Sequence, residues 1–419
     1  MKGFPELTTV SLFLERLFDA IPETKGFEVE SCKLIDASGR IAGEDVTCPF
    51  DLPNFDRSAV DGYALRALGT VGASPTNPIE YKVVATIAAG DIPNNSLKIG
   101  DGETALIFTG APMPEGADSV VMIEYCDRQD NLAQIRRQIY PVQNVSRRGE
   151  DFLKNERILS AGTVLRPWHI AAIASIGKNS IKVRKMLRIG VLSTGSEIVE
   201  QGQALLPGQV ANSTKPMLLS FIEEDHCQPV DLGTVPDDFG IIKQSVIQGL
   251  ETCDIILTTG GSSVGERDLV QQAVSQIGGY RFIAHGVRLR PARPTGAYIA
   301  KDKPVVALSG FPVAAMVAFE AIVKPTIRRL TGGEEELQSR VRGVLKRRVS
   351  NETGNKSYVR VRVIKSSNGL EVEPLMLTGS GLLSTLTRAN GLLIIDEEIE
   401  GFDEGEEVEI LLTANVLSS

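Results

Sequence analysis

The sequence predicts a multidomain protein in which a three-layer α/β domain lies between β-rich parts of the chain. Its 419 residues exceed one typical core, and at about 150 residues per domain they indicate about three domains. Residues 186–332 alternate strand-like and helix-like patterns, which is typical of a parallel sheet covered by helices. Residues 335–419 alternate β-formers with turns, as a small β-barrel does.

The part of the chain before residue 186 divides into three regions. An N-terminal helix is expected within residues 1–26. Residues 27–49 and 145–185 have the composition of two pieces of one small linking domain. Between them, residues 50–144 contain many Gly and Pro turns between β-formers, and this pattern predicts a β-rich inserted domain.

Two apolar strands of the α/β domain end in loops of small residues. The segment RIGVLSTGSE (188–197) reaches Thr194 and Gly195 and then presents Glu197. The segment CDIILTT leads into TTGGSSVGERD (258–268), a glycine pair followed by hydroxyl side chains and an acidic helix start. Open parallel sheets bind ligands outside the carboxyl ends of their strands, so we expect a binding site at these loops.

The second loop is suited to an anion. Gly260, Gly261 and Gly265 can adopt a positive φ and place no Cβ in the way. Their amides can therefore converge on a phosphate or another oxyanion, together with the hydroxyls of Ser262 and Ser263. The alternative is that these glycines only turn the chain. The similar junction at 188–197 favours the binding site.

Acidic residues follow three of the predicted strands. Glu197 follows the first, Asp237 and Asp238 follow CQPVDLGTVPDD, and Asp268 follows the glycine loop. Each of them could be a solvated surface group or a helix cap. Their joint position beside a phosphate loop indicates a Mg²⁺ site instead, with Glu197, Asp237 and Asp268 as candidate ligands, because Mg²⁺ takes hard oxygen ligands together with substrate phosphates.

A basic segment, RLRPARPTG (288–296), stands out in a chain with a formal net charge of −9. Two or three of Arg288, Arg290 and Arg293 can face one way on an extended, proline-stiffened segment and hold a dianion. The alternative is a solvated basic loop. The following segment, ALSGFPVAAMVAFE (307–320), predicts another strand, a Gly-Phe-Pro turn and a helix.

Composition excludes several other classes of protein. The five cysteines are scattered without a C-x-x-C pair, and the three histidines are dispersed, which argues against a disulfide framework or a zinc site and for a reducing cytoplasm. Net acidity makes nucleic acid an unexpected partner. Residues 304–323 are apolar, but a Gly-Phe-Pro interruption and Glu320 favour a buried strand, turn and helix over a membrane span. No signal peptide is expected.

Taken together, these segments resemble the cofactor-binding domain of the molybdopterin molybdenumtransferase family, the MoeA and gephyrin E-domain group. Four more segments are similar to the remaining signatures of that family, in its order and over essentially the whole chain: DRSAVDGYA (56–64), FTGAPMPEGADSVVMIEY (108–125), RRGED (147–151) and GSGLLSTLTRANGLLIID (379–396). The resemblance implies a transferase that inserts molybdate or tungstate into adenylylated molybdopterin, releases AMP and requires Mg²⁺.

The resemblance also implies site residues. Asp61, Thr109 and Asp151 match active-site residues that reach across the cleft of a homodimer, and Glu197, Asp237 and Asp268 match acidic site residues. It further implies contacts with a molybdopterin adenylyltransferase and with cofactor-accepting enzymes. The candidate substrate-binding residues are Thr194, Gly195, Gly260, Gly261, Ser262, Ser263, Gly265, Arg290, Arg293, Ser309 and Pro312.

Two motifs depart from the commoner family pattern. An archaeal-like RPARP stands in place of KPGKP, and LSGFP in place of LPGNP, so that Ala292, Ser309 and Phe311 replace glycine, proline and asparagine. Arginine keeps the positive charge and adds a fork suited to oxyanions. A glycine that needs a positive φ cannot simply become alanine, so we expect a different backbone around Ala292.

Two other functions stay open at this stage. One is a non-catalytic dimeric scaffold of the same family, as gephyrin clusters receptors through its dimer. The retained acids, Asp61 and Asp151 among them, favour an enzyme. The other is a nucleotide-binding hydrolase acting on a different adenylylated compound, which would not explain the DGYA and RANGLL segments.

Overall fold

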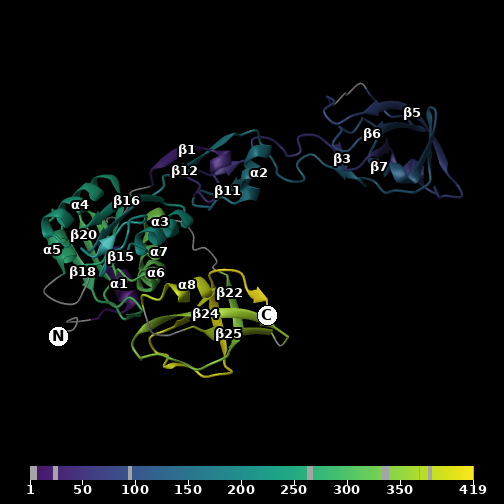
Figure 1. The fold of residues 1–419 in the computed structure, drawn as a ribbon. Helices are drawn as coiled ribbons and strands as arrows, with labels where there is room; N and C mark the ends of the chain where they lie inside the picture. The colour runs from purple at the N-terminus through teal and green to yellow at the C-terminus, as the bar shows by residue number, and fades with distance from the viewer. Residues whose placement is uncertain are drawn as a thin grey trace. The chain divides into compact units, whose positions relative to one another are not determined.

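The computed structural model describes residues 7–21, 27–92, 97–261, 268–332, 339–367, 369–375 and 380–418. The chain divides into two compact units (Figure 1). The first comprises Met1–Glu30, Gly39–Ile41 and Arg184–Ser419, and the second comprises Ser31–Ser38 and Ala42–Val183.

The second unit contains a small helical part and a β-sheet part. In the small part, β2 (Val46–Thr47) pairs with β11 (Arg157–Leu159), β1 (Val29–Lys33) pairs with β12 (Ser180–Arg184), and α2 (Pro167–Ser175) covers a core that includes Leu165 and Ile173. Residues from both expected segments of the linking domain therefore share one hydrophobic core.

The β-sheet part forms from the region that the Gly and Pro turns mark. Its six-stranded sheet has the order β7-β4-β6-β5-β9-β8, and β3 (Arg57–Ser58) pairs with β10 (Val145–Ser146) at its base. The strands of the sheet are β4 (Gly62–Leu65), β5 (Ile79–Ile87), β6 (Glu103–Ile107), β7 (Ser119–Met122), β8 (Cys126–Gln129) and β9 (Leu132–Ile135). This confirms the β-rich character predicted for the insertion.

The first unit contains the predicted α/β domain. Its six-stranded sheet has the order β16-β13-β17-β21-β20-β18, in which the first four strands are parallel and the last two are antiparallel. The strands are β13 (Arg188–Thr194), β16 (Gln228–Val235), β17 (Ile255–Thr259), β18 (Arg281–His285), β20 (Gly296–Ala300) and β21 (Lys303–Leu308). The nearly continuous buried runs of β13, β17 and β21 are typical of strands covered on both faces.

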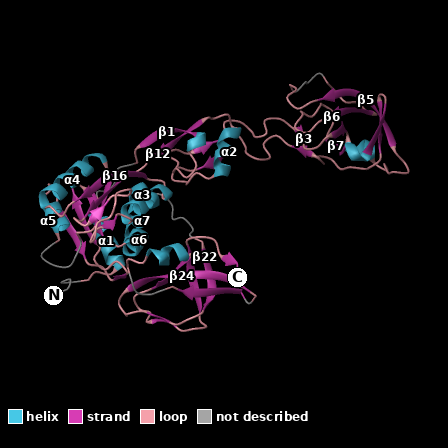
Figure 2. Cartoon of the chain, viewed as in Figure 1, coloured by secondary structure: helices cyan, strands magenta, loops and turns pink. Residues whose placement is uncertain are grey.

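Helices cover both faces of this sheet (Figure 2), which confirms the three layers. One face packs against α1 (Val10–Ala20), α3 (Thr214–Glu224), α6 (Pro312–Ala318), a π-helical turn (Phe319–Val323) and α7 (Lys324–Thr331). The other face packs against α4 (Phe239–Thr252) and α5 (Leu269–Ser275). The apolar 304–323 stretch is therefore a buried strand, turn and helix, as expected. No helix among the described residues is long and apolar enough to cross a membrane.

The C-terminal region of the first unit is the predicted β-barrel. Five strands close on each other in the order β24-β25-β22-β28-β26, and β24 also pairs with β26. They are β22 (Arg340–Leu345), β24 (Lys356–Ser366), β25 (Gly369–Pro374), β26 (Gly391–Ile395) and β28 (Glu407–Leu412). Four short strands, β19 (Leu289–Arg290), β23 (Val349–Ser350), β27 (Gly401–Phe402) and β29 (Leu417–Ser418), and α8 (Leu383–Arg388) complete it.

The barrel is joined to the α/β domain through β19. This strand contains Arg290 of the basic segment and pairs in parallel with β24, where Leu289 faces Lys356 and Arg290 faces Ser357. The basic segment is therefore part of the junction between the two folds, because it extends the barrel sheet.

Candidate functional site at the sheet edge

The ends of three parallel strands meet at one edge of the sheet, as the sequence predicts. Thr194 of β13 pairs in register with Val235 of β16, and Ser193 pairs with Thr259 of β17. A hydrogen bond of 2.9 Å joins the hydroxyls of Ser193 and Thr259 beneath the loops. The loops that follow these strands therefore emerge side by side.

A cavity of about 1140 Å³ opens at this edge. Three groups of residues line it: the strand ends with Thr194, Glu197, Gly260 and Gly261; the 289–294 and 309–314 segments; and Glu352, Ser380, Gly381 and Leu383 from the barrel region. The volume is sufficient for a nucleotide-sized ligand, since ligand sites are commonly about 300–1,000 Å³.

The glycine pair at 260 and 261 is required by both backbone conformation and space. Gly260 has a φ of +86°, and a Cβ there would lie 2.3 Å from the carbonyl oxygen of Thr194. Gly261 has a φ of +65°, and a Cβ there would lie 2.9 Å from Val270. These glycines therefore allow a close approach of two loops at the floor of the cavity. Ser262, Ser263 and Gly265 lie outside the described residues.

Arg290 and Arg293 converge on one carboxylate of the barrel region. The Oε2 atom of Glu352 lies 3.2 Å from Nη1 of Arg290 and 3.7 Å from Nη2 of Arg293. The two arginine side chains are nearly half-exposed, the Glu352 side chain is more exposed, and all three line the cavity. Arg288 instead donates to the carbonyl of Leu7, at 3.3 Å. Two of the three arginines thus face one way.

The backbone conformation of Ala292 differs from the one expected from the sequence. We expect an alanine at this position to avoid a positive φ, but Ala292 has a φ of +119° and is buried. Both the N–H and the hydroxyl of Thr295 donate to its carbonyl oxygen, at 3.1 and 2.8 Å. The surrounding turn therefore holds the alanine in a conformation that favours glycine.

Ser309 and Pro312 lie on another side of the cavity. The hydroxyl of Ser309 accepts a hydrogen bond of 3.2 Å from the N–H of Phe311. Pro312 is the first residue of α6, a position where its fixed φ suits a helix start and its missing N–H costs no helical bond. Both residues line the cavity.

The predicted acidic residues divide into two groups. Glu197 is exposed and lines the cavity, and Asp237 is an exposed neighbour whose N–H donates to the hydroxyl of Ser196 at 3.3 Å. Asp238 and Asp268 cap helices: each accepts from the backbone of the following turn, in α4 and α5. The alternative of a helix cap is therefore observed for these two residues.

Asp268 has a second contact. It is buried, and its Oδ2 atom lies 3.0 Å from Nδ1 of His285. It is not among the residues lining the cavity. Within the described ranges, no three His, Cys, Asp or Glu side chains form a group that could hold a metal ion. The three predicted Mg²⁺ ligands are thus not assembled around one point.

A polar network lies next to the segment that follows Glu197, and it was not predicted from the sequence. The buried Lys215 lies 2.6 Å from Glu200 and 2.9 Å from Asp231. Burial lowers the pKa of Lys215, but its hydrogen bonds to these two carboxylates outweigh burial and leave the pKa raised. The network fixes the short parallel pair β14 (Ile198–Val199) and β15 (Val210–Ala211), which follows Glu197 directly. A single lysine in an amphipathic helix gave no signal of this role.

In the second unit, the structure brings two predicted site residues together. Both the N–H and the hydroxyl of Thr109 donate to Oδ1 of Asp61, each at 2.7 Å. The bond from the backbone N–H, and then that from the hydroxyl, lowers the pKa of Asp61 below its ordinary value. Asp151 is exposed in a bend, where its N–H donates to the carbonyl of Leu52.

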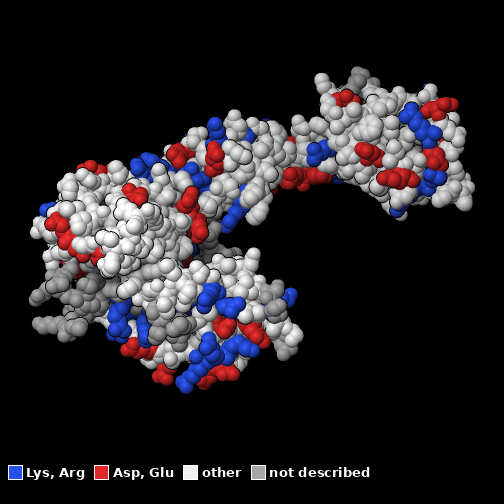
Figure 3. All heavy atoms as spheres, in the orientation of Figure 1, with Lys and Arg blue, Asp and Glu red and all other residues white. Residues whose placement is uncertain are grey.

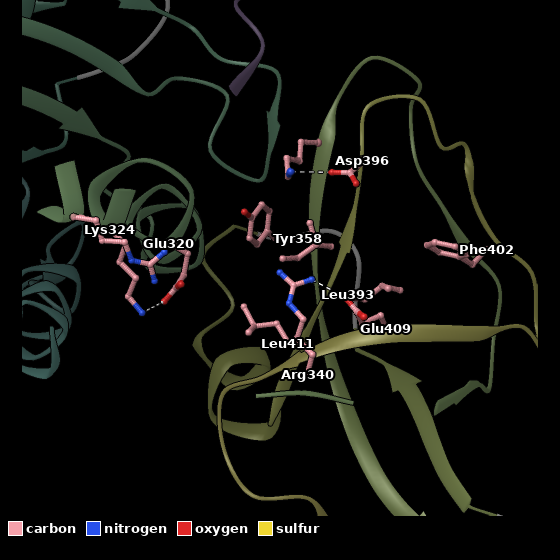
Figure 4. Close-up of a pocket in the computed structure, with 12 residues that line it drawn as sticks. Glu320, Lys324, Arg340, Tyr358, Leu393, Asp396, Phe402, Glu409 and Leu411 are labelled. Carbon is pink, nitrogen blue, oxygen red and sulfur yellow. Dashed lines mark hydrogen bonds and ion pairs between the residues drawn. The ribbon is translucent and has the colours of Figure 1, made fainter. Parts of the chain in front are cut away.

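A second cavity, of about 390 Å³, lies between α7 and the barrel strands (Figure 4). Three of its cations have a carboxylate of their own: Lys324 with Glu320 at 2.7 Å, Arg340 with Glu409 at 2.6 Å and Lys356 with Asp396 at 2.8 Å. Figure 3 shows the same interleaving of basic and acidic side chains on the visible face of the barrel. Burial raises the pKa of Tyr358 in this cavity to about 12.

Known protein families and relatives match this chain over nearly its whole length. Family models match in three regions: the MoeA N-terminal region (domain I and II) at residues 8–177, a probable molybdopterin binding domain at 190–329 and the MoeA C-terminal region (domain IV) at 342–413. A putative molybdopterin biosynthesis protein of Methanocaldococcus jannaschii is 36% identical over 416 residues, which are 97% of this chain and 98% of that protein.

Two further relatives have names that refer to molybdopterin. A molybdopterin molybdenumtransferase of Staphylococcus aureus (strain MRSA252) is 32% identical over 89% of this chain and 88% of its own length. The crystal structure of a molybdopterin biosynthesis MoeA protein from Pyrococcus horikoshii OT3 superimposes with a TM-score of 0.81, at 31% identity, over 97% of this chain and all of that one (100%).

The fold and the cavity define an α/β protein with a large cavity at the carboxyl edge of its parallel strands, joined to a β-barrel. The chain belongs to the MoeA family of molybdopterin molybdenumtransferases, a family of transferases in molybdenum cofactor biosynthesis. The motifs 56–64, 108–125, 147–151 and 379–396 thus indicated the family correctly.

Proposed function

We propose that this protein inserts molybdate or tungstate into adenylylated molybdopterin and releases AMP. The observation that carries the proposal is the sheet-edge cavity, where a glycine backbone, an exposed carboxylate and two guanidinium groups face one space. A phosphorylated pterin and an inorganic oxyanion are both anions, and the cavity offers each a different kind of donor. Its glycine loop suits the phosphate, and its arginine pair suits the oxyanion.

The chemistry consists mainly of positioning. The N–H of Gly260 donates to the carbonyl of Leu308 at 3.3 Å, so the amide of Gly261 holds the phosphate of the adenylyl group, and Arg290 and Arg293 hold the oxyanion through charge-assisted hydrogen bonds. The dithiolene sulfurs that receive the metal belong to the substrate. The protein's own thiols are not required, which agrees with five free cysteines of which four are buried. Free thiols are also the form expected in a reducing cytoplasm, where we place the protein.

Glu197 and Asp237 are the residues that fit Mg²⁺ best. Both carboxylates are exposed at neighbouring strand ends, and Mg²⁺ is commonly bound by one or two carboxylates together with substrate phosphates. When bound, the ion neutralises charge on the phosphate oxygens. Asp268 fits less well, because one of its oxygens caps α5 and the other lies beside His285. It would have to give up one of these contacts to become a ligand.

We further propose that the active unit is a homodimer in which Asp61, Thr109 and Asp151 complete the partner's site. This role comes from the family resemblance. It is supported by the Asp61–Thr109 pair, because two hydrogen bonds keep the exposed Asp61 carboxylate ionised and oriented without any bound ligand. A carboxylate prepared in this way can contact Mg²⁺ or the reacting phosphate.

The activity is tested by supplying purified protein with adenylylated molybdopterin, Mg²⁺ and either molybdate or tungstate. We expect AMP release that depends on the oxyanion and on Mg²⁺. The dimer is tested by mixing Asp61→Asn chains with Glu197→Gln chains. Each homodimer should be inactive, whereas one site of a mixed dimer is intact and should restore up to about half of the activity per dimer. No recovery in verified mixed dimers would refute the shared site.

A further inference from the structure

Phe311 places an aromatic ring in the sheet-edge cavity. The residue lines the cavity, and 59% of it is exposed. It occupies the N-cap position of α6, but its side chain makes no capping bond. A large apolar side chain with this exposure has no role in the core or in the helix start. Its ring is therefore accessible to a ligand in the cavity that it lines.

The backbone that carries this ring is held against the glycine loop. The hydroxyl of Thr214 donates to the carbonyl of Gly310 at 2.7 Å, and the N–H of Phe311 donates to the hydroxyl of Ser309 at 3.2 Å. A Cβ on Gly310 would lie only 3.7 Å from the Cα of Gly260. The ring is thus attached one residue away from the floor where we place the phosphate, on a segment with little freedom to move.

The surroundings of the ring differ from the rest of the cavity. A Cβ on Gly381 would lie 3.1 Å from Cδ1 of Phe311, so a glycine at 381 leaves the ring the room it uses. The exposed Leu383 lines the same cavity. One part of the cavity therefore has guanidinium groups and a carboxylate, and another part has an aromatic and an aliphatic surface.

A contact between the α/β domain and the barrel is the simpler explanation for Phe311. Such a contact would bury most of the ring, whereas more than half of the residue is accessible. An exposed ring in a site that also binds charge is suited to a ligand with a flat, heteroaromatic part and an anionic part, because aromatic rings stack in offset geometry with planar groups.

We propose that Phe311 determines substrate specificity by stacking on the flat heteroaromatic ring of the ligand while the glycine loop holds its phosphate. The identity of the ligand rests on the proposed function, since adenylylated molybdopterin carries two such rings, adenine and pterin. Either ring presents the same chemistry to Phe311. The binding experiment below separates them and needs no turnover.

The first experiment uses a fluorescent reporter in place of the ring. The chain has one tryptophan, Trp168, so the double variant Trp168→Phe and Phe311→Trp has its only indole in the cavity. Titration with AMP, with a simple pterin and with ribose 5-phosphate should give saturable quenching by AMP or by the pterin. Ribose 5-phosphate has the phosphate without a heteroaromatic ring and should quench little. Absence of quenching by both aromatic ligands would overturn the proposal.

The second experiment measures affinity. Phe311→Ala should raise the Kd of the quenching ligand by about 2- to 12-fold, the range that corresponds to the worth of an aromatic pair. Phe311→Tyr should retain the wild-type Kd. The matched control is Phe282→Ala, which removes an equally exposed ring (52% exposed) that does not line the cavity. An equal effect of both alanine variants, or no effect of Phe311→Ala, would contradict stacking.

The two proposals can fail separately. If wild-type protein releases no AMP, the proposed reaction is wrong, but quenching by AMP or pterin still supports the stacking. If wild-type protein releases AMP and Phe311→Ala has an unchanged KM for adenylylated molybdopterin, only the stacking is wrong. A true stacking contact should raise that KM and leave the KM for molybdate within about twofold.

Discussion

The two cavities of the first unit contain similar charged side chains, but these side chains pair with one another differently. In the cavity between α7 and the barrel, three cations each have their own carboxylate within 2.8 Å. In the sheet-edge cavity, Arg290 and Arg293 share Glu352, at 3.2 and 3.7 Å. Three of the four cations that line the smaller cavity thus have a carboxylate of their own. In the larger cavity the two arginines share one carboxylate, while the second carboxylate of the lining, Glu197, lies at the strand ends, so the two cavities differ in how their charges are arranged.

The backbone that lines the two cavities also differs. The smaller cavity is lined by side chains of regular helices and strands, whereas the larger one has strand-to-loop junctions with Gly260 and Gly261 at positive φ. A glycine loop beside two cations that share one carboxylate favours an anion site, while matched ion pairs on helices and strands mainly hold two folds together.

The largest effect should come from Gly260→Ala. The new Cβ would lie 2.3 Å from the Thr194 carbonyl oxygen, so the loop must shift and its amides must leave their positions. We expect AMP release to fall by a factor on the order of 10² or more, as when an oxyanion donor is lost. The control is Gly405→Ala in the barrel, which has a φ of +90° but open space around it. Equal losses of activity in both variants would show that backbone strain alone is responsible.

Arginine removal should separate the two cavities. Arg290→Ala should raise the molybdate or tungstate concentration for half-maximal AMP release by about 10- to 100-fold, the range for a charge-assisted hydrogen bond. Arg340→Ala should leave that concentration unchanged and lower the free energy of unfolding by about 1 kcal/mol or less, because its ion pair is half-exposed. The comparison fails if Arg340→Ala changes the oxyanion dependence as much as Arg290→Ala does.

A smaller effect of opposite sign is expected at Glu352. An incoming oxyanion must compete with this carboxylate for the two guanidinium groups. Glu352→Gln should therefore lower the half-maximal oxyanion concentration by roughly 2- to 5-fold at low salt, and the gain should shrink at high salt. Glu409→Gln is the matched change in the other cavity and should have no such effect. A higher oxyanion requirement in Glu352→Gln would mean that Glu352 orients the arginines instead.

The smallest effect concerns Ala292. Glycine would relieve the strain of a φ of +119°, worth about 1–3 kcal/mol, but would remove a buried methyl group worth about 0.8 kcal/mol and make the unfolded chain more flexible by about 0.5–1 kcal/mol. Because these terms nearly cancel, Ala292→Gly should change the free energy of unfolding by less than about 1 kcal/mol. Denaturant unfolding measures this, and a loss above about 2 kcal/mol would contradict strain at Ala292.

The sequence predicted the parts of the site that local patterns determine. The apolar run before Thr194 and that before Gly260 predicted parallel strands, and parallel strands must end at one edge. Alternation over 335–419 predicted the barrel. The motifs around Asp61 and Thr109 indicated site residues, and the structure adds the two hydrogen bonds that join them.

The remaining features depend on contacts between distant segments. Glu352 meets Arg290 only because β19 extends the barrel sheet beside β24, and no local pattern in either segment predicts this pairing. Lys215 looks like a solvated helix residue until β14 and β16 bring carboxylates to it. The conformation of Ala292 is set by Thr295 and the surrounding turn, which outweigh the preference of a single alanine.

The most direct test of this difference between the cavities is a crystal structure of the protein with AMP and Mg²⁺ bound. We expect the phosphate within hydrogen-bonding distance of the Gly261 backbone, in the cavity that also contains Arg290, Arg293 and Phe311. A phosphate bound among Arg340, Lys356 and Tyr358 instead would contradict the assignment of the sheet-edge cavity as the active site.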